Sequence, residues 1–219
     1  SRADGLWGRA AANVRTGRGM MDCGLQLPAR IGPNAILQLV PVLDRAVGAR
    51  ARQGLFHEAA VALPPADAGM LPQSEVIRLN RALCFWLPTL APDLLRQAGL
   101  ATGDYILAHR IPALAQRTIR ALPAAWGARL LAKAIAKHAW TFVGSGDFAI
   151  EGFAPLTITI RQNPLATDIA GHPGCVWHAA VFERLFGALV WPQVRVREVC
   201  CCANHSALCR FTLCPEVRA

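Results

Sequence analysis

The residues best suited to chemistry lie near the C-terminus. Glu198 is followed three residues later by Cys201 and eight residues after that by Cys209, and Cys175 stands 23 residues before the glutamate. Three thiols and one carboxylate, supplied by two parts of the chain, can surround a soft divalent cation with four donors. Structural Zn²⁺ sites are closed and four-coordinate in this way. The spacing therefore predicts a structural metal site, with zinc as the expected ion.

The strand pattern before Glu198 supports this prediction. Residues 194–199 alternate valine and arginine up to the glutamate, and the side chains of a strand point alternately to opposite faces. Glu198 therefore shares the face of Val194 and Val196. A carboxylate on an apolar face is costly unless it is paired or binds a metal. Cys201 has the opposite parity, so we expect the strand to turn at or before it.

The last predicted strand, residues 207–213, places Cys209 on the same face as Phe211. We therefore expect the Cys209 thiol to point inward. Three thiolates and a carboxylate around Zn²⁺ leave the site negatively charged. The arginines expected to offset this charge are those nearest in the sequence, Arg195, Arg197 and Arg210.

Two other interpretations of the cysteines stay open at this level. Buried cysteines often act as small apolar side chains. An iron–sulfur cluster could draw in addition on Cys200, Cys202 and Cys214. Because Cys200, Cys201 and Cys202 are adjacent, spacing alone does not single out the ligand among them.

The composition bounds the class of protein. Of the 219 residues, 53% are hydrophobic and 17% are charged, which argues against disorder. No apolar run of about 18 residues occurs, so a membrane span is not expected. Residues 1–20 lack the apolar core of a secretory signal. We therefore expect reduced thiols and a cytoplasmic location.

The net charge of +9 comes mostly from arginine. It indicates either a solvated basic surface or an anionic partner, such as a carboxylated ligand, a lipid headgroup surface or an acidic protein. The sequence has no nucleic-acid recognition motif, and nucleic acid is not an expected partner.

The elements that must position the site follow from hydrophobic periodicity. Helices are expected over 33–47 with a kink at Pro41, 50–62, 74–86 with Ser74 as N-cap, 92–98, 103–120 with a break at Pro112, 124–143 and 176–190. Strands are expected over 147–151, 156–162, 194–199 and 207–213. The predicted fold class is α+β, in which N-terminal helices precede a small antiparallel sheet packed with helices. The domain organisation would be an irregular basic segment 1–30, a helical part 31–125 and a metal-binding module 126–219 that is continuous with the helical part.

A glycine-containing segment, Gly144–Ala149, has the formal spacing of a dinucleotide-binding loop. Such a loop must open a helix that faces the pyrophosphate, and here strand-like residues follow. We interpret the segment as a tight turn between a helix and a strand. No NAD(P) or flavin site is recognised.

Together these motifs resemble the 4-vinyl-reductase domain family, which includes the aromatic-sensing modules of phenol-responsive transcription activators. The resemblance rests on the Glu-x-x-Cys-x₇-Cys block with its upstream cysteine, on Gly144–Phe148 and on Asn163-Pro164. Residues 29–36 resemble the opening of the BchJ-type bacteriochlorophyll-biosynthesis members, so the resemblance spans nearly the whole chain.

The resemblance implies that the zinc ligands are Cys175, Glu198, Cys201 and Cys209, which sets Cys200 and Cys202 aside. It also implies an α+β fold similar to trafficking-complex subunits of the TRAPP type, a homodimer, and a pocket for a hydrophobic ligand. The family name implies 4-vinyl (8-vinyl in newer numbering) reduction of a divinyl chlorophyll precursor.

No residue pattern shows how the chain would deliver hydride, and a closed zinc site has no open position for substrate. We therefore expect a bacteriochlorophyll-biosynthesis protein that binds a divinyl magnesium tetrapyrrole and presents or carries it to other pigment-biosynthesis enzymes, with possible peripheral contact at the photosynthetic membrane. The alternatives are that the chain is itself the 4-vinyl reductase, or that it is a sensor or scaffold domain for a small aromatic ligand.

Candidate pigment contacts follow helical spacing near the start of the C-terminal module. They are Trp126, Leu130, Ala134, His138 and Phe142, with Trp177 and His178 from the next helix. A stripe of this kind is also typical of plain core. His138 and His178 are the candidate axial ligands of the magnesium.

Overall fold

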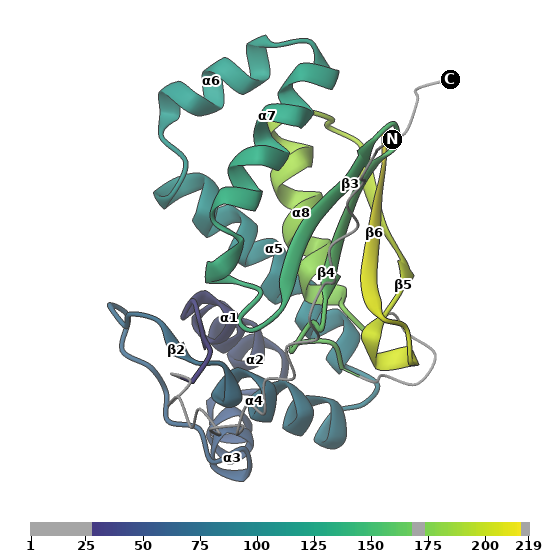
Figure 1. Cartoon of the computed structure of the whole chain (residues 1–219). Coiled ribbons are helices and arrows are strands. Elements are labelled where there is room, and N and C mark those ends of the chain that lie inside the picture. The colour runs from purple at the N-terminus through teal and green to yellow at the C-terminus, as the bar shows by residue number, and fades with distance from the viewer. Residues whose placement is uncertain (1–27, 168–173, 216–219) are drawn as a thin grey trace, which may run out of the picture.

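The computed structural model describes residues 28–167 and 174–215. It combines a helical body with a four-stranded antiparallel sheet (Figure 1). The helices are α1 Asn34–Leu37, α2 Leu39–Val47, α3 Ala49–Glu58, α4 Gln73–Trp86, α5 Ala91–His109, α6 Ala113–Ala121, α7 Ala124–Lys137 and α8 Val176–Leu189, with 3-10 turns η1 Ala139–Thr141 and η2 Cys202–Asn204. The strands are β1 Arg30–Ile31, β2 Leu71–Pro72, β3 Asp147–Phe153, β4 Leu156–Arg161, β5 Val194–Cys200 and β6 Leu208–Pro215.

The predicted α+β class is confirmed, and each predicted strand of the C-terminal part is present. Most of the predicted irregular segment 1–30 lies outside the described residues. Within the described parts of the chain, no helix has both the length and the apolar character needed to cross a bilayer.

The large sheet has the strand order β3-β4-β6-β5, and neighbouring strands are antiparallel. Its inner face is apolar, and Ile158, Ile160 and Phe211 are fully buried there. Helix α8 lies along this face (Figure 1), where the ring of Phe182 packs edge-on against that of Phe211 with 5.5 Å between centroids. One covered face and one solvated face explain why β5 and β6 alternate in burial.

Helix α5 packs against α8 on the side away from the sheet. The two helices come very close, because a Cβ atom at Gly99 would lie 2.5 Å from the carbonyl oxygen of Trp177. A Cβ at Gly103 would lie 2.6 Å from the Cβ of Arg184. Arg184 also pairs with Asp104 at 2.6 Å. The small residues of α5 therefore set the position of α8, and with it the start of α8, which carries Cys175.

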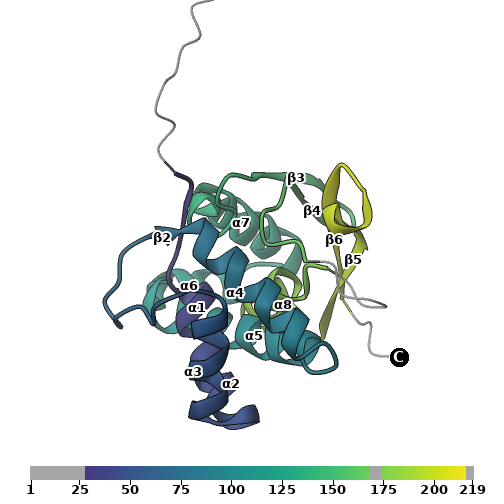
Figure 2. The ribbon, with the colours of Figure 1, turned by 90° about the horizontal axis from the view of Figure 1, so that it is seen from below.

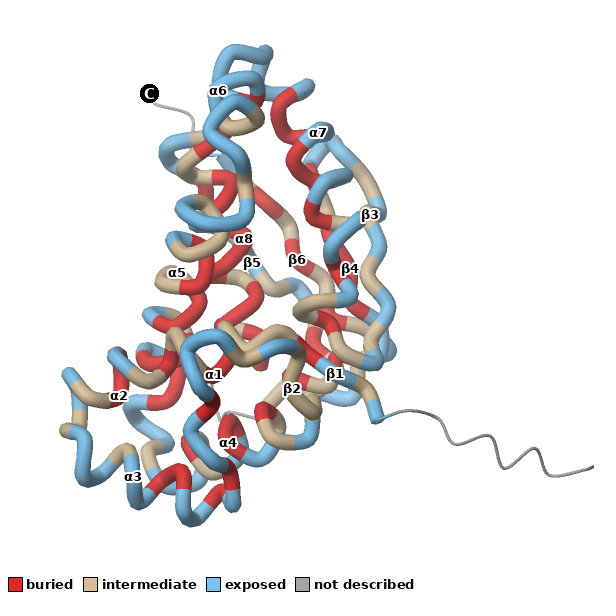
Figure 3. Tube along the Cα trace, turned by 90° about the vertical axis from the view of Figure 1, so that its left-hand side faces the viewer, coloured by how far each residue is buried: buried red, intermediate tan, exposed pale blue. Residues whose placement is uncertain are grey.

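Helices α1–α4 form the rest of the helical body, around α4 in Figure 2. Their buried leucines, among them Leu39, Leu43, Leu79 and Leu83, belong to the same hydrophobic core as the inner face of the sheet. Figure 3 shows this core as buried trace on the facing sides of helices and sheet, with exposed trace outside. The predicted helical part and metal-binding module thus share one core.

The start of α4 differs from the prediction. Ser74 is not the N-cap, because the helix already begins at Gln73 and Pro72 occupies the cap position. The reason is tertiary: the Gln73 backbone N–H donates to the Ala29 carbonyl at 2.9 Å. The prediction of a Ser74 cap was wrong.

Three further helix boundaries also differ. Helix α5 runs unbroken through the predicted gap after residue 98, because its glycines pack against α8. The segment predicted as helix over 124–143 is α-helical only to Lys137. Pro41 lies in the first turn of α2, where a missing N–H costs little, and the chain divides at Gln38 instead.

The glycine-containing segment forms the predicted turn between helical residues and a strand. Gly144 has φ of 58°, a conformation that favours glycine. The Gln73 side chain binds the adjacent Ser145 twice, accepting from its backbone N–H at 2.8 Å and donating to its hydroxyl at 2.9 Å. Strand β3 follows directly, so the segment does not open a helix.

Candidate metal centre

The four predicted ligands come from three elements that meet at one end of the sheet. Cys175 caps the N-terminus of α8, Glu198 lies on β5 and Cys209 on β6. A register shift between Glu198 and Cys200 ends the regular pairing of β5, and Cys201 follows the strand as the N-cap of η2. The prediction that the strand turns at or before Cys201 is confirmed.

The four side chains converge. One donor atom from each of Cys175, Glu198, Cys201 and Cys209 lies within 4.8 Å of all the others. The Sγ atom of Cys175 is 3.1 Å from that of Cys209 and 3.6 Å from that of Cys201, and the latter two are 3.7 Å apart. Sulfurs at about 2.3 Å from a tetrahedral Zn²⁺ would be roughly 3.8 Å apart. The spacing therefore suits a metal ion of this size.

Glu198 has one oxygen committed and one free. Its Oε2 accepts from the Cys175 backbone N–H at 2.9 Å. Its Oε1 is buried without a hydrogen-bond partner among the described residues. Burial, the largest cause, raises the pKa of the Glu198 carboxyl to about 7. A buried carboxylate oxygen without a partner is rare in folded proteins, and a bound cation would supply the missing contact.

The thiols show the same need for a cation. Hydrogen bonds from the Cys175 and Cys209 thiols lower the pKa of Cys201 to about 2. The same sharing, first of all with Cys201, raises the pKa of Cys175 well above its usual range. Without a metal, one thiolate is thus held by protons on its neighbours. A divalent cation would allow all three sulfurs to ionise, as metal binding to thiols requires.

The predicted arginine compensation is not the arrangement found for Arg210. Its guanidinium makes a two-pronged ion pair with Glu151 of β3, at 2.7 and 2.9 Å. Arg210 therefore lies on the solvated face of the sheet, whereas Cys209 next to it points inward and is fully buried. The parity rule that placed Cys209 inside also places Arg210 outside.

Dipoles, not arginines, face the sulfurs. The side-chain amide of Asn163 donates to the Cys175 sulfur at 3.1 Å and lies 3.7 Å from that of Cys209. Its carbonyl oxygen accepts from the Leu165 N–H at 3.1 Å, so the amide orientation is fixed. The Cys202 backbone N–H donates to the Cys209 sulfur at 3.3 Å. Hydrogen bonds of this kind stabilise thiolate ligands and orient them.

Asn163 extends this arrangement to a buried histidine. His178 is 1% exposed, and burial lowers its pKa to about 4, so it is neutral. Its Nε2–H donates to the Phe142 carbonyl at 3.3 Å, which leaves Nδ1 to accept from Asn163 at 3.4 Å. The sequence pattern indicates Asn163 only as part of a motif, because a contact to sulfurs 12 and 46 residues away leaves no local signal.

Replacing Asn163 by aspartate is expected to weaken metal binding by about 10- to 100-fold, the usual cost of losing an outer hydrogen bond to a ligand. The aspartate would keep the oxygen that accepts from Leu165 but would place negative charge, not an N–H, beside two sulfurs. Competition with a chromogenic chelator measures the change. Asn34→Asp, on α1 far from the cluster, is the matched control. Equal affinities for the two variants would contradict the role of Asn163.

The remaining described cysteines stand apart from this group. The Cys200 thiol donates to the Leu208 carbonyl at 3.5 Å, and Cys214 pairs in register with Arg195 at the other end of the strands. Neither they nor Cys202 belong to the set of donors within 4.8 Å. The geometry therefore favours a four-donor mononuclear site over a cluster that uses the extra cysteines.

The predicted pigment contacts divide into two groups. Trp126, Leu130, Ala134 and His138 lie on the exposed outer face of α7 and just beyond its end, and the side chains of Trp126 and Leu130 are 62% and 45% exposed. The buried face of α7 consists of small and aliphatic residues, Gly127, Ala128, Leu131, Ala132 and Ile135. Phe142, Trp177 and His178 lie in or against the core. The structure thus does not bring the seven residues together into one pocket wall.

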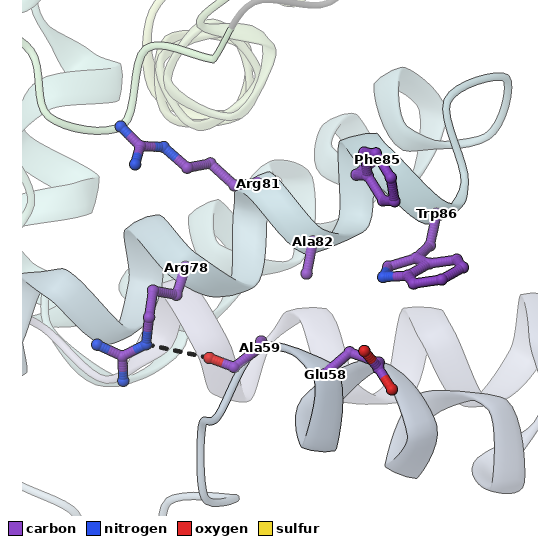
Figure 4. Close-up of a pocket in the computed structure, with 7 residues that line it drawn as sticks. All are labelled: Glu58, Ala59, Arg78, Arg81, Ala82, Phe85 and Trp86. Carbon is purple, nitrogen blue, oxygen red and sulfur yellow. Dashed lines mark hydrogen bonds between the residues drawn. The ribbon is translucent and has the colours of Figure 1, made fainter.

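A shallow groove that the sequence did not indicate lies between α3 and α4 (Figure 4). Its volume is about 430 Å³, and it is lined by Glu58, Ala59, Arg78, Arg81, Ala82, Phe85 and Trp86. Arg78 is occupied by the carbonyls of Ala59 and Ala60, at 3.0 Å each.

Residues 156–215 match the 4-vinyl-reductase domain, a range that includes all four converging side chains. Over 196 residues the chain is 56% identical to the "Bacteriochlorophyll synthase 23 kDa chain" of Cereibacter sphaeroides, covering 89% of this chain and 95% of the relative. Over 187 residues it is 55% identical to the protein of the same name from Rhodobacter capsulatus, covering 85% and 88%.

Solved structures with a similar fold have low sequence identity. An iron(II) H-NOX protein variant from K. algicida matches with a TM-score of 0.60 at 12% identity, covering 85% of this chain and 97% of that one. An H-NOX structure that probes the function of heme distortion in that family matches at 0.50 and 9% identity, covering 86% and 98%. The phenol-bound sensory domain of the transcription activator PoxR matches at 0.50 and 18% identity, covering 76% and 90%. These likenesses concern the fold, and the predicted similarity to TRAPP-type subunits stays a prediction.

Proposed function

The chain belongs to the family of the bacteriochlorophyll synthase 23 kDa chains, 4-vinyl-reductase-domain proteins of bacteriochlorophyll biosynthesis, and we propose that in this pathway it binds a divinyl magnesium tetrapyrrole and presents it to the pathway's enzymes. The observation that carries the choice of carrier over enzyme is the donor set. Cys175, Glu198, Cys201 and Cys209 use all four positions of a tetrahedral ion.

Zinc is the ion we propose for this site. Three thiolates with a carboxylate match the donors that Zn²⁺ accepts in closed structural centres. A metal held in this way would join the start of α8 to the β5–β6 hairpin and would contribute to folding stability. It would leave no position at which a substrate could bind the ion.

The fold relatives support a tetrapyrrole as ligand. One solved H-NOX relative was studied for the distortion of its heme, which is a tetrapyrrole, and the PoxR sensory domain holds the aromatic molecule phenol. A fold that accommodates flat aromatic ligands suits a pigment precursor. Burying roughly 300 Å² of such a macrocycle would contribute about 7 kcal/mol before ordering costs.

For the contacts we retain the predicted set and favour its exposed members. Trp126, Leu130, Ala134 and His138 offer an apolar strip with a histidine at one end, whereas contact with Phe142, Trp177 or His178 would require the core to open. His138 is favoured as axial ligand, because both ring nitrogens of His178 have partners. A homodimer, delivery to other pigment-biosynthesis enzymes and peripheral contact with the photosynthetic membrane complete the proposal.

Titrating the purified protein with a divinyl magnesium tetrapyrrole is expected to give a saturable shift of the pigment's absorption spectrum. The spectrum should stay constant when NADPH is added, because a carrier does not reduce the vinyl group. His138→Ala should alter the bound spectrum, since the axial ligand of the magnesium would be lost, while His57→Ala on α3 serves as control.

Other outcomes would replace this proposal. Loss of the vinyl group with NADPH alone would identify the chain as the reductase. Saturable binding of phenol without binding of the tetrapyrrole would favour a small-aromatic sensor, the function suggested by the likeness to PoxR.

A further inference from the structure

The outer surface of α6 and α7 combines exposed apolar side chains with unopposed positive charge. Residues 111–146 contain Arg117, Arg120, Arg129, Lys133 and Lys137 but no aspartate or glutamate. Large apolar side chains in the same segment are strongly exposed: Leu114 75%, Trp126 62%, Trp140 60% and Leu130 45%. Scattered single apolar residues need no explanation, but an apolar group of this size indicates a binding surface.

These features are contiguous on α7. Trp126, Arg129, Leu130, Lys133 and Lys137 recur at intervals of three and four residues, and all are exposed, so they lie along one face of the helix. This face is about 21 Å long for the 14 residues of α7. We refer to these five residues as the α7 outer face.

The outer face continues onto the sheet. The guanidinium of Arg129 lies 5.9 Å from the ring centroid of Trp126 and 5.4 Å from that of Phe153, at the end of β3. Phe153 is itself 37% exposed. Arg129 thus joins the two aromatic rings into one surface, next to the exposed end of the β3–β4 hairpin (Figures 1 and 3).

We propose that the α7 outer face docks the protein on the surface of an anionic lipid bilayer. Tryptophan rings prefer the interface between hydrocarbon and water, and lysine can extend its charged end to the headgroups while its stem lies on apolar surface. A basic face with exposed tryptophan and leucine has the composition of an interfacial helix that lies in the membrane plane. This surface does not depend on pigment binding, and the protein would need no spanning segment.

Charge decides between a bilayer and a second copy of this chain. Among the described residues, no carboxylate forms an ion pair with Arg129, Lys133 or Lys137. Two such faces packed together would oppose like charges, which is unfavourable at an interface. Anionic headgroups attract each basic residue near the surface and leave the tryptophan and leucine side chains a place to insert.

The test is flotation of the full chain, without pigment, with vesicles of phosphatidylcholine alone or mixed with phosphatidylglycerol. Binding is expected with the anionic vesicles and to be at least about tenfold weaker with the neutral ones. Lys133→Glu combined with Lys137→Glu, and separately Trp126→Ser combined with Leu130→Gln, should each weaken binding to anionic vesicles by about tenfold or more.

Matched controls carry the same changes elsewhere. Phe85→Ser with Trp86→Ser removes exposed aromatics, 74% and 56% exposed, on α4, and Arg45→Glu with Arg50→Glu reverses charges on α2 and α3. Both pairs should leave binding within about threefold, since charges away from the contact are screened. Because arginines elsewhere also attract anionic vesicles, the paired variants and not binding alone decide the matter.

Several results would overturn the proposal. These are absence of binding to anionic vesicles, equal loss in the control and α7 variants, and binding that ignores the Trp126 and Leu130 changes while duplex DNA competes for the same lysines. Conversion of a dimer to a monomer by the Trp126→Ser, Leu130→Gln variant, seen by sedimentation, would assign the face to self-association instead. Folding of each variant is checked by its metal content and circular dichroism.

Discussion

Replacing Cys209 by serine is expected to abolish stoichiometric metal binding and to lower the free energy of unfolding by more than about 4 kcal/mol, a size reached when a structural metal is lost. Serine has nearly the volume of cysteine, so the change removes one donor without leaving a cavity. The Cys209 sulfur lies 3.1 Å and 3.7 Å from the other two sulfurs. Elemental analysis and chemical denaturation measure the two effects.

A chelator supplies the independent arm of the experiment. It should destabilise the wild-type protein to the level of the Cys209→Ser variant and should have little further effect on that variant. If Cys209→Ser does not fold, Glu198→Gln is the milder change. It keeps an oxygen for the Cys175 N–H but loses the negative charge, and metal affinity should fall while the fold remains.

Cys200→Ser and Cys214→Ser are the matched controls, because both residues are half-buried cysteines outside the converging group. Neither change should alter metal content. Loss of metal from Cys200→Ser, with retention in Cys209→Ser, would contradict the ligand assignment. Iron and inorganic sulfide in the purified protein would contradict zinc.

The metal centre could be predicted from the sequence because its geometry is written in short-range rules. Strand parity places Glu198 and Cys209 inward and Arg210 outward, and each rule needs only the neighbouring residues. The contact of Cys175 with the hairpin could not be derived in this way, since it joins positions 23 residues apart. It came from the resemblance, and the convergence of the four side chains in the structure agrees with it.

The face of α7 shows where periodicity fails. Two stripes run along this helix, and the one with Trp126 and Leu130 has the larger apolar side chains. The stripe that is buried contains Gly127, Ala128 and Ala132. Small residues contribute little to a hydrophobic pattern, yet they allow close packing: a Cβ at Gly127 would lie 3.0 Å from the Ile119 carbonyl oxygen. A helix that packs through its small residues leaves its large ones exposed.

The same property of small residues explains the unpredicted continuity of α5. Glycine lowers helix propensity, so residues 99–103 looked like a gap between two helices. In the structure Gly99 and Gly103 are the points at which α5 touches α8. Tertiary packing therefore outweighs the local preference at this crossing.

Gly99→Ala is accordingly expected to lower the free energy of unfolding by about 2–4 kcal/mol, although alanine is the better helix former. The new Cβ would lie 2.5 Å from the Trp177 carbonyl oxygen and 2.7 Å from the Cβ of Ala180. Both neighbours belong to the helix itself and cannot rotate away, so α5 and α8 must separate. Chemical denaturation measures the change. Gly54→Ala is the control, because a Cβ there meets nothing within 4 Å, and the protein should become more stable by up to about 1 kcal/mol.

The Gly99→Ala variant should also bind its metal more weakly, which separates this effect from ordinary overpacking. Trp177 lies in the first turn of α8, two residues after Cys175, so a displaced helix moves this ligand while Glu198, Cys201 and Cys209 stay with the hairpin. A site whose donors must lie within 4.8 Å of one another tolerates little displacement. Chelator competition should show at least about tenfold weaker binding. Unchanged affinity together with lowered stability would mean that α5 supports the core but does not position the metal ligand.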